Sequence, residues 1–420
     1  MGRYSGVRVF FRGLGGNRGW RAAWRDVPVP KKQYEVVIIG GGGHGLATAY
    51  YLAKEHNIRD IAIVEQSYLG GGNTGRNTTI IRSNYMMPGN AMFYERALQM
   101  WEGLSRELNF NIMVSQRGIY NLCHSPAQID AARRRGNIMR SCGIDAELLE
   151  GGQLQRRLPV VDFSQRARFP VLAALHQPRA GTARHDAVAW GYARAANALG
   201  ADIIQQCQMT GFLFDKDGGV CGVQTTKGDI RAAKTGIAVA GNSGMIAKMA
   251  GLRLPMETHT LQAFVSEPLK PLVDTVITFG AAHCYISQSD KGGLVMGGDL
   301  DGYNSYAKRG ALPIAEDTLA SAKALIPATS RLKIIRQWAG AVDMTMDGSP
   351  FVCKTPLAGL YLNGGWCYGG FKATPASGWC FAWTMANDKA HDDNAAFNLE
   401  RFANGVHIDE KGAGANPAAH

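Results

Sequence analysis

The chain alternates between short apolar runs, glycine clusters and longer segments in which apolar residues recur at helical spacing. The first apolar run, VVII at 36–39, is followed by a glycine cluster and then by LATAYYLAKEH, which predicts a strand, a tight turn and a helix. A second run, IAIV at 61–64, predicts the next strand. A strand, a crossover helix and a second strand are typical of a parallel sheet, so we expect the folded body to begin near Tyr34.

Similar patterns extend through the rest of the chain. Helical spacing recurs at 91–108, at 126–142, at 186–199 and in GFKATPASGWCFAWTMAND, which begins at residue 370. Strand-like runs lie at 201–240, 259–299 and 359–366. The β-α-β opening followed by groups of consecutive strands predicts an α/β part joined to an α+β part.

Composition supports a large core. Of the 420 residues, 46% are hydrophobic and 19% are charged, and this length suggests two domains or three. The net charge of +11 favours an acidic partner subunit or anionic ligands, because no nucleic-acid-binding motif or long lysine run accompanies it. The eight cysteines lack C-x-x-C pairing and zinc-ligand spacing, so we expect free thiols in a reducing compartment and no metal site. No apolar run reaches the length of about 18 residues that spans a membrane.

The two ends of the chain differ from the body. Residues 1–25 hold six arginines and no acidic residue, which fits either a transit peptide or a basic arm that lies on a partner. The segment lacks the apolar core of a secretory signal, and we favour a partner arm that extends over 1–33. We assign 403–420 to a C-terminal tail and expect the part after Glu410 to be flexible or to contact a partner.

The glycine cluster contains a nucleotide-binding pattern. Gly40, Gly42 and Gly45 form G-x-G-x-x-G between the first strand and the first helix, and Glu65 ends the second strand 20 residues after Gly45. Such glycines let the backbone approach a pyrophosphate at a helix N-terminus, and the acid can accept hydrogen bonds from a ribose. The spacing predicts a dinucleotide site without separating FAD from NAD. Further glycine turns at 236–244 and 361–378 favour FAD, a long cofactor contacted from several segments.

Several longer motifs carry a resemblance to a known family. They are GGGGHGLATAYYLAKEH, GRNTTIIRSNY, SQRG, RHDAVAWGYARAA, LQAFVSEPLKP, SQSDKGGLVMGG, MDGSP, GGFKATPASG and HIDEKG. The pattern resembles the amine-oxidising branch of the D-amino-acid-oxidase-like flavoproteins and, over nearly the whole chain, the β subunits of heterotetrameric sarcosine oxidases. The resemblance implies two domains. A Rossmann-like FAD-binding domain would comprise 34–120, 180–250 and 340–402, and a substrate and interface domain with a largely antiparallel sheet would comprise 121–179 and 251–339.

The resemblance also implies an activity. The chain would be the β subunit of a complex with α, γ and δ subunits in the bacterial cytoplasm. It would oxidise sarcosine at noncovalent FAD and pass the electrons to covalent FMN at the α–β interface and then to O2. The products would be glycine, H2O2 and either formaldehyde or 5,10-methylenetetrahydrofolate, the latter from tetrahydrofolate on the α subunit. Sarcosine and dimethylglycine differ by one methyl group, which motifs do not resolve.

Two other functions stay open on the sequence. One is a single-flavin FAD-dependent dehydrogenase of another N-methyl or D-amino acid, and the other is a non-enzymatic flavin-binding scaffold with a basic partner-binding arm. The two-flavin subunit carries covalent FMN, whereas the single-flavin dehydrogenase does not. The scaffold would show no turnover of an amine even with all subunits present, whereas the enzyme would.

The motif Arg184-His185-Asp186 is the candidate FMN attachment site. In the resembled family the histidine of this motif carries FMN through its 8α-methyl carbon, which implies covalent FMN at His185. We expect Asp186 to cap the helix that follows, so that His185 lies just outside that helix. On the residues alone, His185 can also be an ordinary exposed histidine beside a helix cap.

Two cations are the candidate catalytic residues. Arg82 follows a loop rich in glycine and amide residues, and the resemblance implies that it meets the substrate carboxylate, to which a guanidinium binds in bidentate fashion. Lys372 begins a predicted helix, and its family counterpart lies in the active-site region. Without the resemblance, both can be solvated surface charges. The remaining cofactor contacts implied by position are Gly43, His44, Asn73, Asn77, Thr78, Met209, Gly369 and Gly370 for FAD, and Arg76 for either a flavin phosphate or the FMN side.

The sequence departs from its relatives at three points. The resemblance implies that monomeric relatives use a lysine near the flavin for oxygen activation, and the matching position here is Val295, which fits reduction of oxygen at a second flavin. Monomeric relatives tether FAD to a cysteine in a region that reads WAGAVDMTMDG here, so we expect FAD to be noncovalent. Cys367 stands where the β subunits commonly have glycine, and the sequence assigns it no role.

Overall fold

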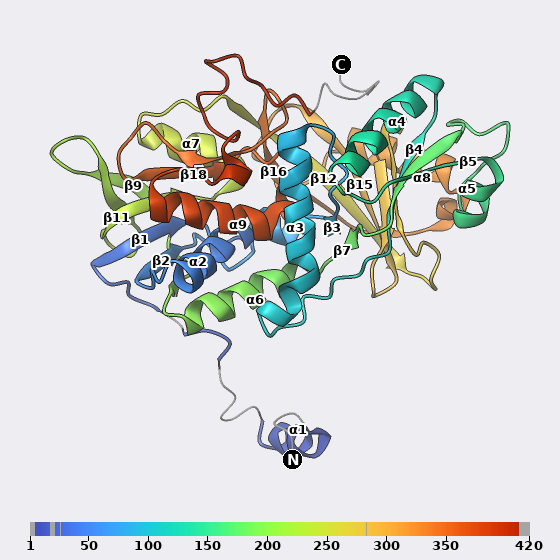
Figure 1. The fold of residues 1–420 in the computed structure, drawn as a ribbon. Coiled ribbons are helices and arrows are strands. Elements are labelled where there is room, and N and C mark those ends of the chain that lie inside the picture. The colour runs from blue at the N-terminus through green and yellow to red at the C-terminus, as the bar shows by residue number, and fades with distance from the viewer. Residues whose placement is uncertain (1–4, 17–21, 26, 283, 411–420) are drawn as a thin grey trace.

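The apolar run at 36–39 lies at the centre of a mostly parallel sheet in the computed structural model, which describes residues 5–16, 22–25, 27–282 and 284–410 (Figure 1). The central strand β1 (Gln33–Ile39) pairs in parallel with β2 (Ile61–Val64) and β11 (Ile230–Ile237). The other strands are β8 (Asp202–Ile204), β9 (Met209–Phe214), β10 (Val220–Thr225), β17 (Phe351–Lys354) and β18 (Leu360–Gly364). The order is β17–β18–β11–β1–β2–β8, and β10 and β9 continue antiparallel from β11.

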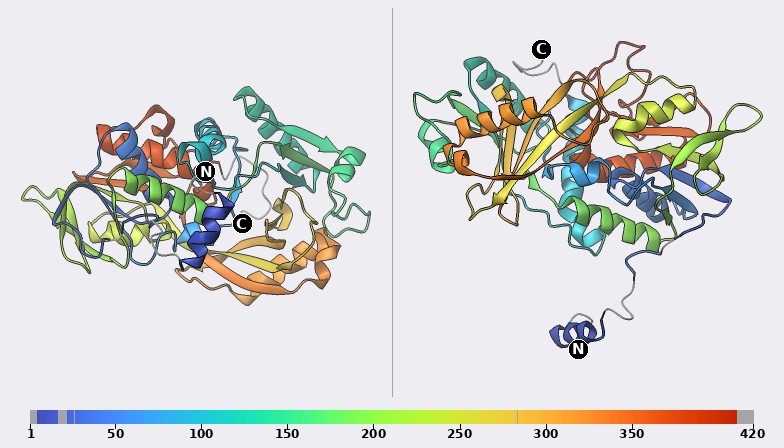
Figure 2. Two further views of the ribbon diagram at one scale, coloured as in Figure 1. Left: turned by 90° about the horizontal axis from the view of Figure 1, so that it is seen from below. Right: turned by 180° about the vertical axis from the view of Figure 1, so that it is seen from behind.

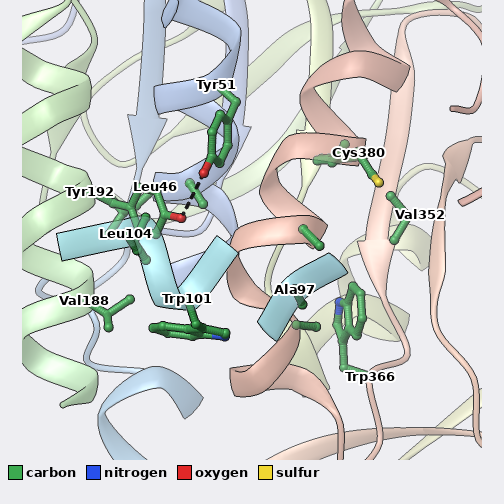
Figure 3. Close-up of a cluster of buried hydrophobic side chains, with 14 of the residues drawn as sticks. Leu46, Tyr51, Ala97, Trp101, Leu104, Val188, Tyr192, Val352, Trp366 and Cys380 are labelled. Atoms are coloured by element: carbon green, nitrogen blue, oxygen red, sulfur yellow. Dashed lines mark hydrogen bonds between the residues drawn. The ribbon is translucent and has the colours of Figure 1, made fainter. Parts of the chain in front are cut away.

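Side chains of β1 alternate between two cores. Val36 and Ile38 pack under helices on one face, whereas Val37 and Ile39 belong to the core on the other face with α7 (Ser243–Met249). The helices of the first face are α2 (Gly43–Glu55), α3 (Pro88–Glu107), α6 (His185–Ala198) and α9 (Gly370–Asn387). Figure 3 shows their packing around Trp101, with the hydroxyls of Tyr51 and Tyr192 3.4 Å apart.

A second sheet lies beside the first (Figure 1). Its strands are β4 (Ile119–Cys123), β5 (Glu147–Glu150), β6 (Ala173–Gln177), β12 (Met256–Pro268), β13 (Val276–Phe279), β14 (Cys284–Gln288), β15 (Gly293–Asn304) and β16 (Ile334–Thr345). The order is β16–β12–β15–β14–β13–β4–β6–β5, and only the β13–β4 pair among these described neighbours is parallel. The helices α4 (Pro126–Ser141), α5 (Gly151–Arg157) and α8 (Leu312–Leu325) pack on it.

Short elements join the two sheets. The ribbon of β3 (Ile80–Ile81) and β7 (Gly181–Thr182) lies between them in Figure 1. Single turns of 3-10 helix are η1 (Asn73–Arg76), η2 (Ala240–Asn242), η3 (Gly280–Ala282), η4 (Pro327–Arg331) and η5 (Asp392–Asn394). The ribbon and η1 hold the loop that carries Arg82 between the parallel sheet and the antiparallel one.

This architecture confirms the predicted fold class, a mostly parallel α/β part joined to a largely antiparallel sheet. The helices predicted at 91–108, 126–142 and 186–199 are α3, α4 and α6. Helix α8 was not predicted, because its buried face consists mostly of small or hydroxyl side chains such as Ala315, Thr318 and Ser321. The division of the chain into domain segments stays a prediction.

The chain ends behave differently from each other. Helix α1 (Gly6–Leu14) has no buried residue and lies away from the body (Figures 1 and 2). Parts of the predicted arm (1–4, 17–21 and 26) and of the predicted tail (411–420) lie outside the described residues. Residues up to 410 return to the body, where Ile408 is buried and its carbonyl accepts a hydrogen bond of 2.8 Å from Ser349 Oγ. Within the described ranges, no helix is both long and apolar enough to cross a membrane.

Candidate functional site

The glycine turn leaves no room for side chains. A Cβ on Gly40 would lie 2.3 Å from the carbonyl oxygen of Ala238, and one on Gly45 would lie 2.1 Å from the carbonyl oxygen of Gly40. Gly40 also has a φ of +111°, which disfavours any residue with a side chain. Helix α2 begins at Gly43, whose amide donates to Thr74 Oγ1 at 2.9 Å, so the N-terminus of this helix lies at the end of β1.

Glu65 is fixed beside this turn by two backbone donors. Its Oε2 accepts a hydrogen bond of 2.9 Å from the amide of Gly41, and its Oε1 accepts one of 2.9 Å from the amide of Ser67. Each carboxylate oxygen keeps a further lone pair. The buried carboxylate can therefore accept ribose hydroxyls while the protein holds it in place.

A cavity of about 1020 Å³ extends from the glycine turn to the interface of the two sheets. Fourteen of the sequence-predicted site residues line its wall: Gly40, Gly42, Gly43, His44, Glu65, Asn73, Arg76, Asn77, Thr78, Arg82, Met209, Gly369, Gly370 and Lys372. The volume lies at the upper end of the range for small-molecule sites. The glycine cradle, the acid and the volume together fit a dinucleotide such as FAD. Of the predicted residues, Gly45 packs beneath the turn, and His185 lies outside the cavity wall.

The loop from Asn73 to Thr78 is tied to the second sheet. Asn73 Nδ2 donates to the carbonyl oxygen of Ala341 at 2.5 Å, and Thr78 Oγ1 donates to the Tyr285 hydroxyl at 3.1 Å. Asn77 instead donates to the carbonyl oxygen of Thr74, and Arg76 donates to those of Gly71 and Gly72, just before the loop. These polar side chains shape the cavity wall between the sheets, and their positions follow from the protein's own hydrogen bonds.

His44 connects the glycine turn to the start of α9. Its Nδ1 lies 2.5 Å from Ser377 Oγ, and its Nε2 lies 2.8 Å from the carbonyl oxygen of Gly370. Burial lowers the pKa of His44 to about 4, so the ring is neutral near pH 7. With both ring nitrogens engaged by the protein, His44 aligns two helix N-termini on one cavity.

The start of α9 is closely packed. Gly369 is its N-cap residue, and a Cβ there would lie 1.8 Å from the hydroxyl of Tyr94. Tyr94 in turn stacks on Tyr85 with ring centroids 3.7 Å apart. Both tyrosines line the cavity, and burial raises the pKa of each above its usual value. Neutral phenols at this position act as hydrogen-bond donors or acceptors and not as charges.

Arg82 and Lys372 bring positive charge to this end of the cavity. Arg82 Nη1 donates to Asn84 Oδ1, and the guanidinium lies 4.7 Å from the ring centroid of Tyr85. Lys372 is 7% exposed and donates through Nζ to the carbonyl oxygen of Tyr368 at 2.6 Å. Burial, and after it the charge of Arg82, lowers the pKa of Lys372 well below its usual range. A bound carboxylate would relieve this destabilisation of the charged lysine.

The structure corrects the predicted start of α6. The helix begins at His185 with Arg184 as the N-cap residue, so Asp186 lies in the first turn and is not the cap. Asp186 is instead held by Arg184, whose Nη2 lies 2.9 Å from Asp186 Oδ2. The predicted cap was wrong by two residues, and His185 is the first helical residue instead of lying outside the helix, because an ion pair with Arg184 satisfies Asp186 within the first turn.

His185 retains one unsatisfied nitrogen. Its Nδ1 is buried and has no hydrogen-bond partner, and burial lowers the pKa of the ring below its usual value. A neutral imidazole with a nitrogen lone pair is chemically suited to form a bond to an electrophilic carbon. These features fit a covalent flavin attachment without showing one.

Several cavity residues were missed from the sequence. They are Asn84, Tyr85, Tyr94, Arg135, Asp343, Trp366 and Glu410. Asn84 and Tyr85 belong to the motif GRNTTIIRSNY, and Glu410 belongs to HIDEKG, so those motifs held a signal. Trp366 lies in the glycine turn before α9, and Asp343 lies in the segment WAGAVDMTMDG, both noted above for other reasons. Tyr94 and Arg135 come from the helices α3 and α4, where helical spacing gave no separate sign of a site.

One cluster has the residue types of a metal site. The ligand atoms of Cys380, His391 and Asp393 lie within 4.8 Å of one another. However, His391 Nδ1 accepts a hydrogen bond of 3.1 Å from the Asp393 amide, and Arg96 Nε lies 3.2 Å from Asp393 Oδ2. Burial also raises the pKa of the Cys380 thiol well above its usual value. An arginine partner and a protonated thiol do not favour a cation.

The fold and the nucleotide cradle define a dinucleotide-binding oxidoreductase of the flavoprotein type. The model of the FAD dependent oxidoreductase family matches residues 35–383. The chain is 59% identical over 418 residues to sarcosine oxidase subunit beta of Rhizobium meliloti, with 100% of both chains covered. It is 47% identical to sarcosine oxidase subunit beta of Rhodobacter capsulatus, with 98% of each covered. The chain belongs to the FAD-dependent oxidoreductases and, within them, to the family of sarcosine oxidase β subunits.

Solved structures agree on the fold. L-proline dehydrogenase from P. horikoshii superposes with a TM-score of 0.82 at 26% identity, covering 90% of this chain and 99% of that one. Glycine oxidase from Geobacillus kaustophilus superposes with a TM-score of 0.79 at 22% identity, covering 88% and 99%. At this identity the second likeness speaks for the fold alone.

Proposed function

We propose that this chain oxidises sarcosine as the β subunit of a multi-subunit sarcosine oxidase, with noncovalent FAD in the cavity. The observation that carries the proposal is one continuous cavity with a nucleotide cradle at one end and two cations at the other. Gly40, Gly42 and Glu65 would hold the adenosine and pyrophosphate, and the N-terminus of α9 at Gly369 would face the ring system. FAD supplies the acceptor for the hydride equivalent that leaves the N-methyl group.

The chain's own residues bind and orient the substrate. Arg82 and Lys372 would share the carboxylate of sarcosine, and Asn84 holds the guanidinium through its Oδ1. Anion binding would return Lys372 to its charged form, because the carboxylate offsets the burial that lowers its pKa. The stacked rings of Tyr85 and Tyr94 form part of the cavity wall that also carries these two side chains.

The second cofactor and the partners belong to the same proposal. FMN bound covalently at His185 would supply a separate place for oxygen reduction, next to an α subunit that carries tetrahydrofolate. The γ and δ subunits would complete the complex. The unsatisfied Nδ1 of His185 and the similarity to sarcosine oxidase β subunits support this assignment.

The test is mass spectrometry of the complex produced by coexpression with the partner subunits. After acid denaturation we expect an FMN-sized adduct on the peptide that contains RHDAVAW, with FAD released into the supernatant. His185→Ala should remove the adduct and the oxidase activity while FAD stays bound. His407→Ala, at an exposed histidine, is the matched control. An unmodified wild-type peptide, or full oxidase activity without the adduct, would reject the two-flavin function.

A further inference from the structure

One face of α4 borders the substrate end of the cavity. Gln128, Ala131, Ala132 and Arg135 are spaced three or four residues apart, so they lie on one side of the helix, and all four line the cavity. The two alanines are short and leave the guanidinium of Arg135 room to reach the cavity. Helix α4 packs on the antiparallel sheet, so this guanidinium enters from a different side of the fold than Arg82 or Lys372.

The guanidinium of Arg135 has no hydrogen-bond or ion-pair partner within the part of the chain that the structure describes. Burial lowers the pKa of Arg135, and the charges that act on it next are Glu410, which raises the pKa, and Arg82, which lowers it. The carboxylate of Glu410 is engaged elsewhere, since it accepts hydrogen bonds of 2.8 Å each from the amides of Met86 and Met87. Arg135 is therefore a charged donor group without a dedicated acceptor, which is costly unless a ligand supplies one.

The other carboxylates on the cavity wall are also occupied. Glu65 accepts from the amides of Gly41 and Ser67, and Asp343 accepts from the amide of Gly365. Asp299 likewise has a partner. Among the described residues, none of these carboxylates accepts a hydrogen bond from the Arg135 guanidinium, and the charge of Glu410 acts on Arg135 only as an electrostatic interaction that raises its pKa.

The three cations exceed what one substrate carboxylate can satisfy. In the proposed function, on which this step rests, Arg82 and Lys372 share the carboxylate of sarcosine. Arg135 is then left over in the same cavity, where a like charge is unfavourable at low effective dielectric. A second carboxylate on the ligand would relieve this repulsion and supply the acceptor that Arg135 lacks.

We propose that Arg135 binds a second carboxylate, so that the cavity accepts secondary amines with an acidic N-substituent, such as N-(carboxymethyl)glycine, besides N-methylglycine. In such a substrate one carboxymethyl carbon gives a hydrogen with its electron pair to the FAD of the proposed function, and the nitrogen loses a proton, which forms an imine. Water then adds to the imine carbon and the C–N bond breaks. The products are glycine and glyoxylate, and both electrons reside on the cofactor.

The test compares two ligands that cannot be oxidised at nitrogen because sulfur replaces the amine. (Methylthio)acetate carries one carboxylate and thiodiacetate carries two. Each is titrated into the FAD-loaded complex while flavin absorbance is followed. We expect Arg135→Gln to raise the Kd of thiodiacetate about 10-fold or more, since a charge-assisted hydrogen bond is lost, and to leave the Kd of (methylthio)acetate unchanged. Arg134→Gln removes the same charge from an exposed position of α4 and should change neither constant.

The outcomes separate Arg135 from the proposed function. Equal effects of Arg135→Gln on both ligands, no effect on either, or no binding of thiodiacetate to the wild type would overturn the second carboxylate site. If Arg135→Gln does not fold, Arg135→Lys keeps the charge without the bidentate geometry and should weaken thiodiacetate selectively. A wild-type complex that binds thiodiacetate through Arg135 but is not reduced by sarcosine would reject the proposed function and keep the site.

Discussion

The two ends of the cavity differ in how their polar groups are satisfied. At the glycine turn, Glu65 and His44 have their hydrogen bonds supplied by the protein, and the backbone is packed so closely that a methyl group does not fit. At the opposite end, burial lowers the pKa of Lys372 well below its usual range, and the Arg135 guanidinium has no hydrogen-bond or ion-pair partner among the described residues. Groups satisfied within the protein build the shape of the site, whereas groups left without a counter-charge are available to a ligand. The buried Nδ1 of His185 also has no hydrogen-bond partner, so it belongs with the groups that are available to a ligand.

The largest effect is expected at the closely packed end. Gly45→Ala would place a methyl group 2.1 Å from the carbonyl oxygen of Gly40, and a backbone oxygen cannot move away without opening the turn. We expect a loss of about 3 kcal/mol or more in the free energy of unfolding, together with loss of FAD. Thermal unfolding and the FAD content of the purified complex measure both.

A glycine elsewhere provides the control for this change. Gly103 lies within α3, and a Cβ there would meet nothing within 4 Å. Gly103→Ala should be neutral or stabilising by up to about 1 kcal/mol, because alanine is the better helix former. A Gly45→Ala variant that behaved like Gly103→Ala would show that the turn is looser than its packing indicates.

At the cationic end, the expected effect is on activity. Arg82→Gln and Lys372→Met should each lower kcat/KM for sarcosine by about 10- to 100-fold, the value of one charge-assisted hydrogen bond to the carboxylate. Anaerobic reduction of the flavin by sarcosine measures the effect directly. Lys323→Met, at an exposed lysine of α8, serves as the control. If both site variants kept the wild-type rate of flavin reduction by sarcosine, Arg82 and Lys372 would not bind the substrate.

Lys372→Met should also stabilise the complex without substrate, in a pH-dependent way. Because the pKa of Lys372 is lower in the folded protein than in the unfolded chain, Lys372 opposes folding increasingly as pH falls below the usual lysine value of about 10.4. The variant's advantage in Tm should therefore be larger at pH 7 than near pH 10. An advantage that grew toward pH 10 would contradict the lowered pKa.

The two ends also differ in how far the sequence revealed them. The glycine turn could be predicted because its parts lie within residues 40–65 and backbone sterics demand glycine at fixed spacing. Arg82 and Lys372 came from family motifs. Glu410 was missed because it contacts Met86 across 324 positions of sequence, and no spacing rule describes such a contact. Arg135 was missed because only the packing of α4 on the second sheet brings it to the cavity. The start of α6 was misplaced because a salt bridge and a helix cap use the same residue types.

A smaller effect is expected at Asp343, which lies on the cavity wall. Burial raises the pKa of Asp343 to about 6, and its carboxylate accepts a hydrogen bond from the Gly365 amide. A carboxyl group with a raised folded pKa stabilises the fold fully below its unfolded pKa and loses that contribution as pH rises through 6. Asp343→Asn keeps an oxygen acceptor without the charge.

The variant should therefore gain stability above pH 6, by at most about 3 kcal/mol at pH 8, and gain nothing at pH 4. Denaturant unfolding at the two pH values measures the difference. Asp217→Asn, at an exposed acid in the loop between β9 and β10, is the control. A stability gain that is equal at both pH values would mean that Asp343 does not titrate in this range.

The smallest effect concerns Cys367, whose backbone has a φ of +48°, in the left-handed region that glycine adopts without strain. This conformation explains why glycine suits the position. It also predicts that a glycine variant is more stable than an alanine variant, the reverse of the order expected where φ is negative. Cys367→Ala keeps the strained backbone and loses the contacts of Sγ with Thr345, whereas Cys367→Gly loses the same contacts and relieves the strain. We expect the glycine variant to be more stable than the alanine variant by about 1 kcal/mol, as measured by denaturant unfolding. Alanine equal to or better than glycine would mean that the chain does not hold this backbone conformation in solution.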